Sequence, residues 1–181
     1  MYDIIILGVI KMLLINCSNR EENCYRVLND IKKDNDKLIS LSNKRMDFCL
    51  GCYKCKERLD NYCVLDDYIT ENVYKEMITS DNIVLASPIY MSNINGILKN
   101  LIDRLLPFYN HQLLRNKNIY LVLTGGGSKD YNKDEIEGII NYFKGISEWL
   151  YFNFIFLDYF EDNNPNYNNQ IETIKKNLEN I

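Results

Sequence analysis

The sequence predicts an α/β protein built around a five-stranded parallel sheet with helices on both faces. Apolar runs of strand length alternate with segments whose apolar residues recur at helical spacing. The runs are nearly continuous, as expected for parallel strands buried on both faces. The 181 residues contain no internal repeat, low-complexity linker or domain boundary. We therefore expect a single domain over residues 1–181.

Five apolar runs supply the strands. They are expected at residues 11–16, 37–41, 82–87, 119–124 and 151–157. The third run is uninterrupted, and Pro88 is expected to end it. This succession fits a flavodoxin-like sheet of strand order 2-1-3-4-5. Residues 1–10 precede the first strand and are interpreted as an N-terminal extension, with an added strand, a frayed arm or a misassigned start before Met12 as alternatives.

Helical patterns lie between and after these strands. The apolar faces comprise residues 27, 28 and 31; 69, 73 and 77; 98, 101, 102 and 105; 136, 139, 140, 143 and 146; and 171, 174, 178 and 181. Asp66 and Asp67 place negative charge at the start of the second helix, which suits its macrodipole. Pro107 is expected to stop the third helix, because proline cannot continue a helix interior.

Composition and charge exclude several classes of function. The formal net charge is −4, the pI is about 5.1, and the basic residues are scattered. Nucleic-acid binding, which selects basic surfaces, is therefore not expected. Asp3 and Lys11 interrupt the apolar N-terminus, which is shorter than the roughly 20 apolar residues of a membrane span. With no signal-peptide pattern either, we expect a cytoplasmic protein without a membrane partner.

The segment richest in chemistry is the cysteine segment, residues 46–66, expected as a loop insertion after the second strand. It contains four of the six cysteines, Cys49, Cys52, Cys55 and Cys63, spaced C-x2-C-x2-C-x7-C. In a reducing compartment such a group is expected to bind metal rather than to form disulfides. The compact run of three resembles the run that wraps a [4Fe–4S] cluster. Zinc, or cysteines that hold no metal, are the alternatives, and Cys63 is the ligand that spacing fixes least.

The loop after the first strand places small hydrogen-bonding side chains before a helix. Residues 17–24 read CSNREENC. Backbone amides and the helix dipole favour a phosphate there, and Arg20 adds a charged donor. Glu21 and Glu22 would repel a phosphate if they pointed inward, so we expect them as exposed acids of the first helical turn. An ordinary capped helix start is the alternative.

Two later loops have equally unusual residues. Residues 87–93 read SPIYMSN, in which Tyr90 can pack against a planar ring; a surface tyrosine is the alternative. Residues 124–128 read TGGGS, where consecutive glycines let the backbone approach a ligand, although a flexible turn has the same sequence. Ligands of doubly wound sheets bind at the carboxyl ends of the strands, so we expect these loops, with the cysteine segment nearby, to form one site. The glycine motifs of Rossmann and P-loop proteins do not occur.

With these motifs placed, the chain resembles the flavodoxin-like NADPH-dependent FMN reductase superfamily, and within it the iron–sulfur flavoproteins. The resemblance covers residues 11–157. It is carried by LLINCSNR, by CLGCYKC…C and, most specifically, by ASPIYMSNINGILKNLIDR. The first loop departs from the family pattern, because Cys17 stands where the family has glycine and Asn19 where it has proline, whereas Ser18 and Arg20 are kept.

The resemblance implies two cofactors, FMN and a [4Fe–4S] cluster beside it, with the four cysteines of the cysteine segment as cluster ligands. The first loop would hold the FMN phosphate, and the other two would border the isoalloxazine ring. The implied FMN-binding residues are Ser18, Asn19, Arg20, Asn23, Cys24, Tyr25, Pro88, Ile89, Tyr90, Met91, Ser92, Asn93, Thr124, Gly125, Gly126 and Gly127. Related proteins are commonly homo-oligomers, so a second copy is an expected partner.

Three functions follow as hypotheses. The first is an oxidoreductase that moves electrons between a ferredoxin-like donor and an acceptor through FMN, with the cluster as electron port. The second is an NAD(P)H-dependent FMN or quinone reductase whose cysteines are vestigial or hold zinc. The third is a non-enzymatic module shaped by zinc. No catalytic side chain is expected, because the flavin carries the chemistry. His111 is interpreted as an exposed loop residue, and Cys17 and Cys24 as packing residues.

Overall fold

The structure is a computed structural model that describes residues 12–58, 60 and 62–179. Its elements are β1 (Met12–Asn16), α1 (Asn23–Ile31), β2 (Lys37–Ser40), η1 (Lys54–Lys56), η2 (Ile69–Val73), α2 (Tyr74–Thr79), β3 (Asn82–Tyr90), β4 (Asn93–Ile94), α3 (Gly96–Asp103), α4 (Leu106–His111), β5 (Asn118–Gly125), α5 (Lys133–Leu150), β6 (Asn153–Glu161) and α6 (Tyr167–Glu179). The N-terminal extension expected at residues 1–10 lies outside the described residues. Within the described ranges, no helix combines the length and the apolar character needed to cross a membrane.

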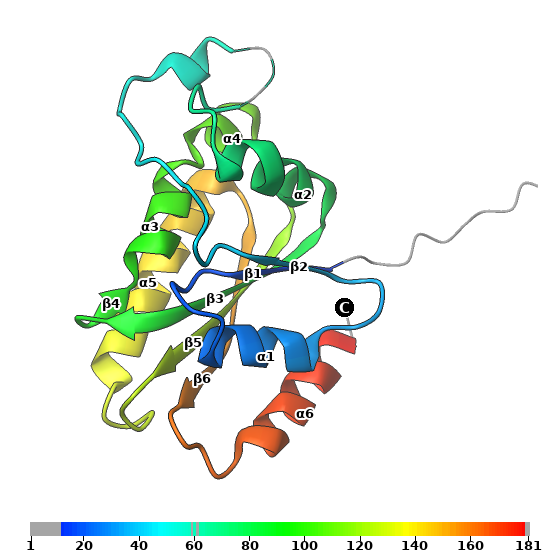
Figure 1. The fold of residues 1–181 in the computed structure, drawn as a ribbon, viewed down its shortest axis with the longest axis vertical. Helices are drawn as coiled ribbons and strands as arrows, with labels where there is room; N and C mark the ends of the chain where they lie inside the picture. Colours follow the sequence, from blue (N-terminus) through cyan, green and yellow to red (C-terminus); the bar gives the residue numbers. More distant parts are fainter. Residues whose placement is uncertain (1–11, 59, 61, 180–181) are drawn as a thin grey trace, which may run out of the picture.

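Five parallel strands form the sheet, in the order β2-β1-β3-β5-β6. This is the predicted order when the parallel strands are counted alone, so the flavodoxin-like α/β class is confirmed. The sequence did not predict β4, which pairs antiparallel with the end of β3. Figure 1 shows α1 and α6 on one face of the sheet, with α2, α3, α4 and α5 on the other.

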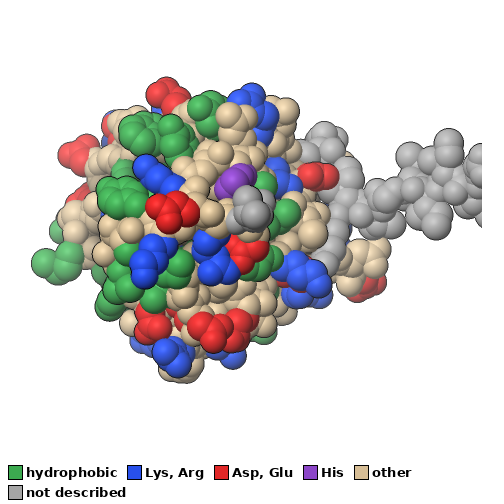
Figure 2. All heavy atoms as spheres, turned by 90° about the horizontal axis from the view of Figure 1, so that it is seen from above, with side chains coloured by type: hydrophobic (Ala, Val, Ile, Leu, Met, Phe, Trp, Pro, Cys, Tyr) green, Lys and Arg blue, Asp and Glu red, His purple; other side chains and the backbone are tan. Residues whose placement is uncertain are grey.

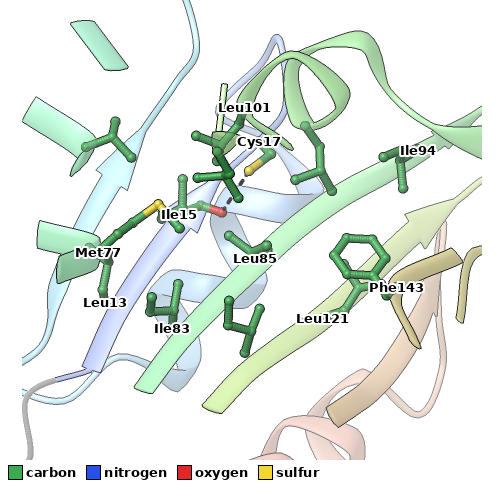
Figure 3. Packing of buried hydrophobic residues seen from close by; sticks show 14 of the residues in the cluster. Leu13, Ile15, Cys17, Met77, Ile83, Leu85, Ile94, Leu101, Leu121 and Phe143 are labelled. Atoms are coloured by element: carbon green, nitrogen blue, oxygen red, sulfur yellow. Dashed lines mark hydrogen bonds between the residues drawn. The ribbon is translucent and has the colours of Figure 1, made fainter. Parts of the chain in front are cut away.

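Each face of the sheet packs its own core. On the α1–α6 side, alternate residues of the central strands, such as Leu14 and Val84, pack against Leu28 and Ile171. The other side is larger and includes the residues shown in Figure 3, among them Leu85 and Phe143. Alternation of side chains along each strand explains why one apolar run serves both cores. The two cores hold the carboxyl ends of the strands rigidly at one edge.

The expectation that Pro88 ends the third strand is wrong, because β3 continues to Tyr90 and Pro88 pairs with Thr124 of β5. The reason lies in the pairing of β3 with its other neighbouring strand, β1. The Ala86 carbonyl accepts from Cys17 N–H at 2.9 Å, so Ala86 and, by alternation, Pro88 direct their backbone groups toward β1. The β1–β3 pairing stops at Asn16↔Ala86, so the missing N–H of proline breaks no ladder bond.

Pro107 does not stop the third helix, which corrects the second proline assignment. α3 ends at Asp103, and Pro107 lies in the first turn of α4, where its missing N–H needs no partner. His111 consequently ends α4 rather than lying in a loop. The last strand also begins later than expected, because Tyr151 takes a left-handed conformation (φ 62°) that ends α5 before β6 starts at Asn153.

The cysteine segment follows β2, as the sequence predicts, and connects β2 to η2. Figure 1 shows it at one end of the molecule, beside α4 and α2. Its short helical turn η1 contacts α4. Figure 2 looks onto this end, where hydrophobic and charged side chains lie side by side. Among the residues of the segment that the structure describes, the large exposed apolar side chains are Phe48, Leu50 and Tyr53. The segment therefore packs against α4 at the turn that carries Cys55.

Candidate functional site

A small pocket of about 90 Å³ lies at the carboxyl ends of β1, β3 and β5; we call it the strand-end pocket. It is lined by Ser18, Arg20, Glu22, Asn23, Cys24, Pro88, Ile89, Tyr90, Thr124, Gly125, Gly126 and Asp162. Ten of these twelve residues are ones that the sequence marks as FMN-binding. The structure thus brings the three predicted loops together, although they are far apart in the chain.

The first loop presents backbone donors and one cation to this pocket. Arg20 N–H donates to Ser18 Oγ at 3.3 Å, which folds the loop into a tight turn. At the start of α1, no side chain accepts a hydrogen bond from the first amide groups of the helix. Arg20 lies 3.1 Å from Glu22, and both side chains are exposed. An anion in the pocket would find free amide donors and a guanidinium that can turn toward it.

Two acids of the pocket escaped the sequence prediction. Glu22 is the residue before α1, not an acid inside its first turn, and it lines the pocket beside Arg20. Asp162 follows β6, and its carboxylate accepts a hydrogen bond from the Asn23 side chain. The sequence could have indicated Asp162 as a pocket residue, because Asp162 follows the last strand at the same edge of the sheet. A bound phosphate has to compete with these carboxylates for Arg20 and Asn23.

Cys24 joins the pocket to the α1–α6 core. Its Sγ lies 3.2 Å from Thr124 Oγ1, and both side chains are buried. Burial raises the pKa of Cys24 to about 12, although the hydrogen bond with Thr124 opposes the shift. Burial also raises the pKa of Cys17, whose Sγ lies 3.7 Å from the Ile15 carbonyl oxygen (Figure 3). Both thiols are buried, as expected of packing residues, and both are held protonated.

The glycine-rich loop, residues 124–128, contributes Gly125 and Gly126 to the pocket lining. A methyl group at Gly125 would lie 2.7 Å from the Tyr159 hydroxyl, so a side chain at this position would force Tyr159 to move. At Gly126, an added methyl would meet only Asp162, at 3.7 Å. Gly126 therefore keeps open space in the pocket that it lines, which is what a closely bound ligand requires.

Six predicted residues do not line the strand-end pocket: Asn19, Tyr25, Met91, Ser92, Asn93 and Gly127. Three of them form or flank the turn of the β3–β4 hairpin beside the pocket, where Met91 is 98% exposed. Met91 and Ser92 both have positive φ, at 49° and 61°, and Ser92 Oγ donates to Glu135 at 3.2 Å. The hairpin therefore presents an exposed apolar tip next to Tyr90, beyond the pocket itself.

The four cysteines line a second space, the cysteine cavity. Its volume is about 20 Å³, and it is lined by Cys49, Leu50, Gly51, Cys52, Tyr53, Cys55, Cys63, Val64, Leu65 and Leu106. Cys49 and Cys52 are exposed, Cys63 is partly buried, and Cys55 is buried. Burial raises the pKa of Cys55, as do the charges of the other three cysteines. Among the residues described, no three Cys, His, Asp or Glu side chains are gathered as around a metal ion.

The strand-end pocket and the cysteine cavity share no lining residue. The pocket lies before α3, at Pro88–Tyr90, whereas the cavity touches Leu106, after α3 has ended at Asp103. The two are therefore separate cavities, and the expectation that the cysteines lie beside the three loops stays a prediction. A larger groove of about 830 Å³ between α3, α4 and α5 adjoins the cavity, because Tyr53 and Leu106 line both.

Comparison with known proteins identifies the family. The sequence model of the NADPH-dependent FMN reductase family matches residues 10–135. The chain belongs to this family. The family resemblance seen in the sequence is thereby confirmed, and the match covers all three loops and the cysteine segment.

Individual proteins add detail to the family assignment. The chain is 35% identical to an iron–sulfur flavoprotein of Methanocaldococcus jannaschii over 58% of its own length and 53% of that protein. It is 30% identical to an iron–sulfur flavoprotein of Methanosarcina thermophila over 62% and 54%. The chain thus spans about half the length of these relatives. The fold matches general stress protein 14 of Treponema denticola, solved with FMN (TM-score 0.61, 17% identity, 93% of this chain and 96% of that one).

Proposed function

We propose that this member of the family binds FMN at the strand-end pocket and a [4Fe–4S] cluster at the cysteine cavity, and exchanges electrons between them and external partners. The observation that carries the proposal is the pair of sites in one chain. The three loops with ligand-type residues meet at the strand ends, and all four cysteines line one cavity. The relatives named iron–sulfur flavoprotein support the same combination.

The strand-end pocket fits the phosphate end of FMN. It is small beside the roughly 300–1,000 Å³ of typical ligand pockets, so it suits one group of the cofactor rather than the whole. Ser18, Arg20 and the amides at the start of α1 would hold the phosphate. Tyr90, a partly exposed residue of the pocket lining, and Met91, which lies beyond the pocket, would contact the isoalloxazine ring. When bound, FMN supplies two-electron redox chemistry, which the protein orients.

The cysteine cavity fits a cluster by its donor set. Four thiols line one space, three of them from a compact run, and thiolates are the ligands that hold iron–sulfur clusters. The cluster, when bound, supplies one-electron transfer. Cys55 would be its buried ligand, and exposed Cys49 and Cys52 would leave one side open to an electron-transfer partner. The thiols have to deprotonate to bind metal, which Cys55 does less readily than an exposed thiol because its pKa is raised.

The decisive test is anaerobic purification followed by an absorption spectrum and metal analysis. We expect one FMN and about four irons per chain, the content of a [4Fe–4S] cluster. Cys52→Ser should lose the iron and keep FMN, whereas the control Cys17→Ala, a buried cysteine outside the motif, should keep both. A yellow protein free of iron and zinc would remove the cluster from the proposal, and a protein that does not retain FMN would remove the flavin.

A second candidate is an NAD(P)H-dependent FMN reductase without a cluster. The observation in its favour is the family match, whose model is named for NADPH-dependent FMN reductases. A similar NAD(P)H-dependent FAD/FMN reductase of Geobacillus thermodenitrificans points the same way. Rapid bleaching of the bound flavin by NADPH alone would favour this candidate. Reduction by a ferredoxin-like protein, with NADPH inert, would favour the first.

A further inference from the structure

The two ends of the cysteine segment meet at one buried side chain, Arg104, the residue that follows α3. Asp47 lies two residues before Cys49, and Asp67 lies four residues after Cys63. The chain between them carries all four cysteines. A contact that joins Asp47 to Asp67 therefore closes the base of the whole ligand-bearing loop.

Arg104 makes that contact with four hydrogen bonds. Its Nη1 donates to Asp67 Oδ2 at 2.7 Å and to the Asp47 carbonyl oxygen at 2.8 Å. Its Nη2 donates to Asp67 Oδ1 at 3.1 Å and to Thr70 Oγ1 at 3.0 Å. Asp67 Oδ2 also accepts from the Asp47 N–H at 2.8 Å. The guanidinium thus binds both sides of the loop base at once, a geometry that lysine cannot reproduce.

The charges of this pair are fully buried, with side-chain exposures of 0% for both Arg104 and Asp67. Burial alone would raise the pKa of Asp67, but hydrogen bonds from Arg104 and from Asp47 N–H outweigh it and lower the pKa. Burying an ion pair is costly, and apolar residues of similar volume often serve stability equally well. A buried pair at this position is better explained by the specific geometry that it imposes on the loop.

The side of the loop that carries Cys63 is tied to the same residue. The Tyr74 hydroxyl donates to the Arg104 carbonyl oxygen. The Tyr74 ring packs edge-on against Tyr62, the neighbour of Cys63, at 5.5 Å between ring centroids. Tyr74 therefore links the Cys63 side of the loop to the backbone of residue 104, while the Arg104 side chain reaches the same side through Asp67. Cys63 is the cysteine whose distance in sequence leaves it least constrained.

We infer that Arg104 is a positioning residue for the metal centre: with Asp67 it clamps the base of the cysteine segment, so that Cys63 is held beside Cys49, Cys52 and Cys55. The inference deepens the proposed function and rests on it. Arg104 touches none of the reacting atoms. It acts by reducing the conformational freedom that the loop has to lose when a cluster is assembled.

Two variants test the clamp. Arg104→Met removes all four bonds but leaves the Asp67 carboxylate buried and unpaired, so the protein itself is expected to be destabilised. Arg104→Met/Asp67→Asn removes the charge as well and leaves an amide oxygen for the N–H groups of Ile69 and Thr70, which Asp67 now serves. We expect the double variant to regain melting temperature relative to the single variant, while both assemble less than half of the wild-type iron and lose it faster to a chelator.

Two controls separate positioning from general stability. Leu178→Ala, in the opposite core, lowers the melting temperature without touching the loop and should keep full iron content. Arg115→Met removes an exposed arginine outside the cysteine segment, whose Nε donates to Gln112, and should also load normally. A double variant that loads full iron with an unchanged electron paramagnetic resonance spectrum would overturn the inference, as would iron loss in Leu178→Ala equal to that in the clamp variants.

A metal-free measurement keeps this inference distinct from the proposed function. Hydrogen exchange of apoprotein amides in residues 41–58 and 62–70 should accelerate in both clamp variants and stay at the wild-type rate in Arg115→Met. If wild-type protein binds no iron, the cluster proposal fails, whereas the exchange result still reports on the clamp. Unchanged exchange in the clamp variants would show that Arg104 does not restrain the loop, whatever the iron content.

Discussion

The strand-end pocket and the cysteine cavity are held in place in different ways. The pocket is built at the ends of strands whose registers are fixed by two packed cores, and neighbouring strands bring its residues together. The cavity is built almost wholly from one loop, whose only lining residue from a regular α-helix or strand is Leu106 of α4. A site on the sheet edge inherits its geometry from the fold, whereas a site on a loop needs its own restraints, here Arg104 and Asp67.

The largest expected contrast is in cysteine reactivity in the metal-free native protein. Cys49 and Cys52 are exposed, whereas Cys24 is buried with its pKa raised from 9.0 to about 12. At a pH below both values, the thiolate fraction of Cys24 is lower than that of an ordinary thiol by roughly 10³. Alkylation followed by peptide mass spectrometry should label the two exposed cysteines first. Equal labelling of Cys24 would mean that the strand-end pocket opens as readily as the loop.

Asp67→Asn should destabilise the protein by about 3–5 kcal/mol, because Arg104 is left buried without its counter-charge. The folded pKa of Asp67 lies below the unfolded value, so its contribution is present above about pH 3.9 and is lost as the pH falls through the folded pKa. Urea unfolding from neutral pH downward measures both effects. The wild type should lose stability in acid, and the variant should show a shallower dependence. Parallel pH profiles would contradict the role of Asp67.

Arg20→Gln tests the other site. Loss of a charge-assisted hydrogen bond to the phosphate costs about 1.5–3 kcal/mol, so the FMN dissociation constant should rise roughly 10- to 150-fold. Fluorescence titration of the apoprotein with FMN measures the change. Iron content and melting temperature should stay at wild-type values, because the Arg20–Glu22 pair is exposed. A variant that binds FMN normally would exclude Arg20 from phosphate binding.

The smallest expected effect comes from Gly126→Ala. The added methyl has room in the protein, yet it narrows the pocket, so FMN should bind roughly fivefold more weakly, about 1 kcal/mol, with little change in melting temperature. Gly125→Ala is the matched comparison, because its methyl would collide with Tyr159 and should lower the melting temperature. If the two variants behaved alike, the space beside Gly126 would not belong to the ligand site.

Much of the fold could be predicted from local patterns. Period and length of the apolar runs identified the five parallel strands and their order, because buried parallel strands leave a continuous apolar signal. Both proline assignments failed for one physical reason. A proline is excluded only where its N–H is needed, and whether a neighbouring strand or a preceding turn needs it depends on the tertiary context.

The sequence by itself determined which loops carry ligand-type residues and which four cysteines belong together, because chain order and spacing encode both. Only the tertiary structure decided that Glu22 and Asp162 share the pocket with Arg20, and that Leu106 of α4 lines the cysteine cavity. Arg104 shows most clearly what could not be predicted from the sequence. The sequence contains no sign that it pairs with Asp67, 37 residues earlier, because such a contact exists only once α3 and the loop base have packed together.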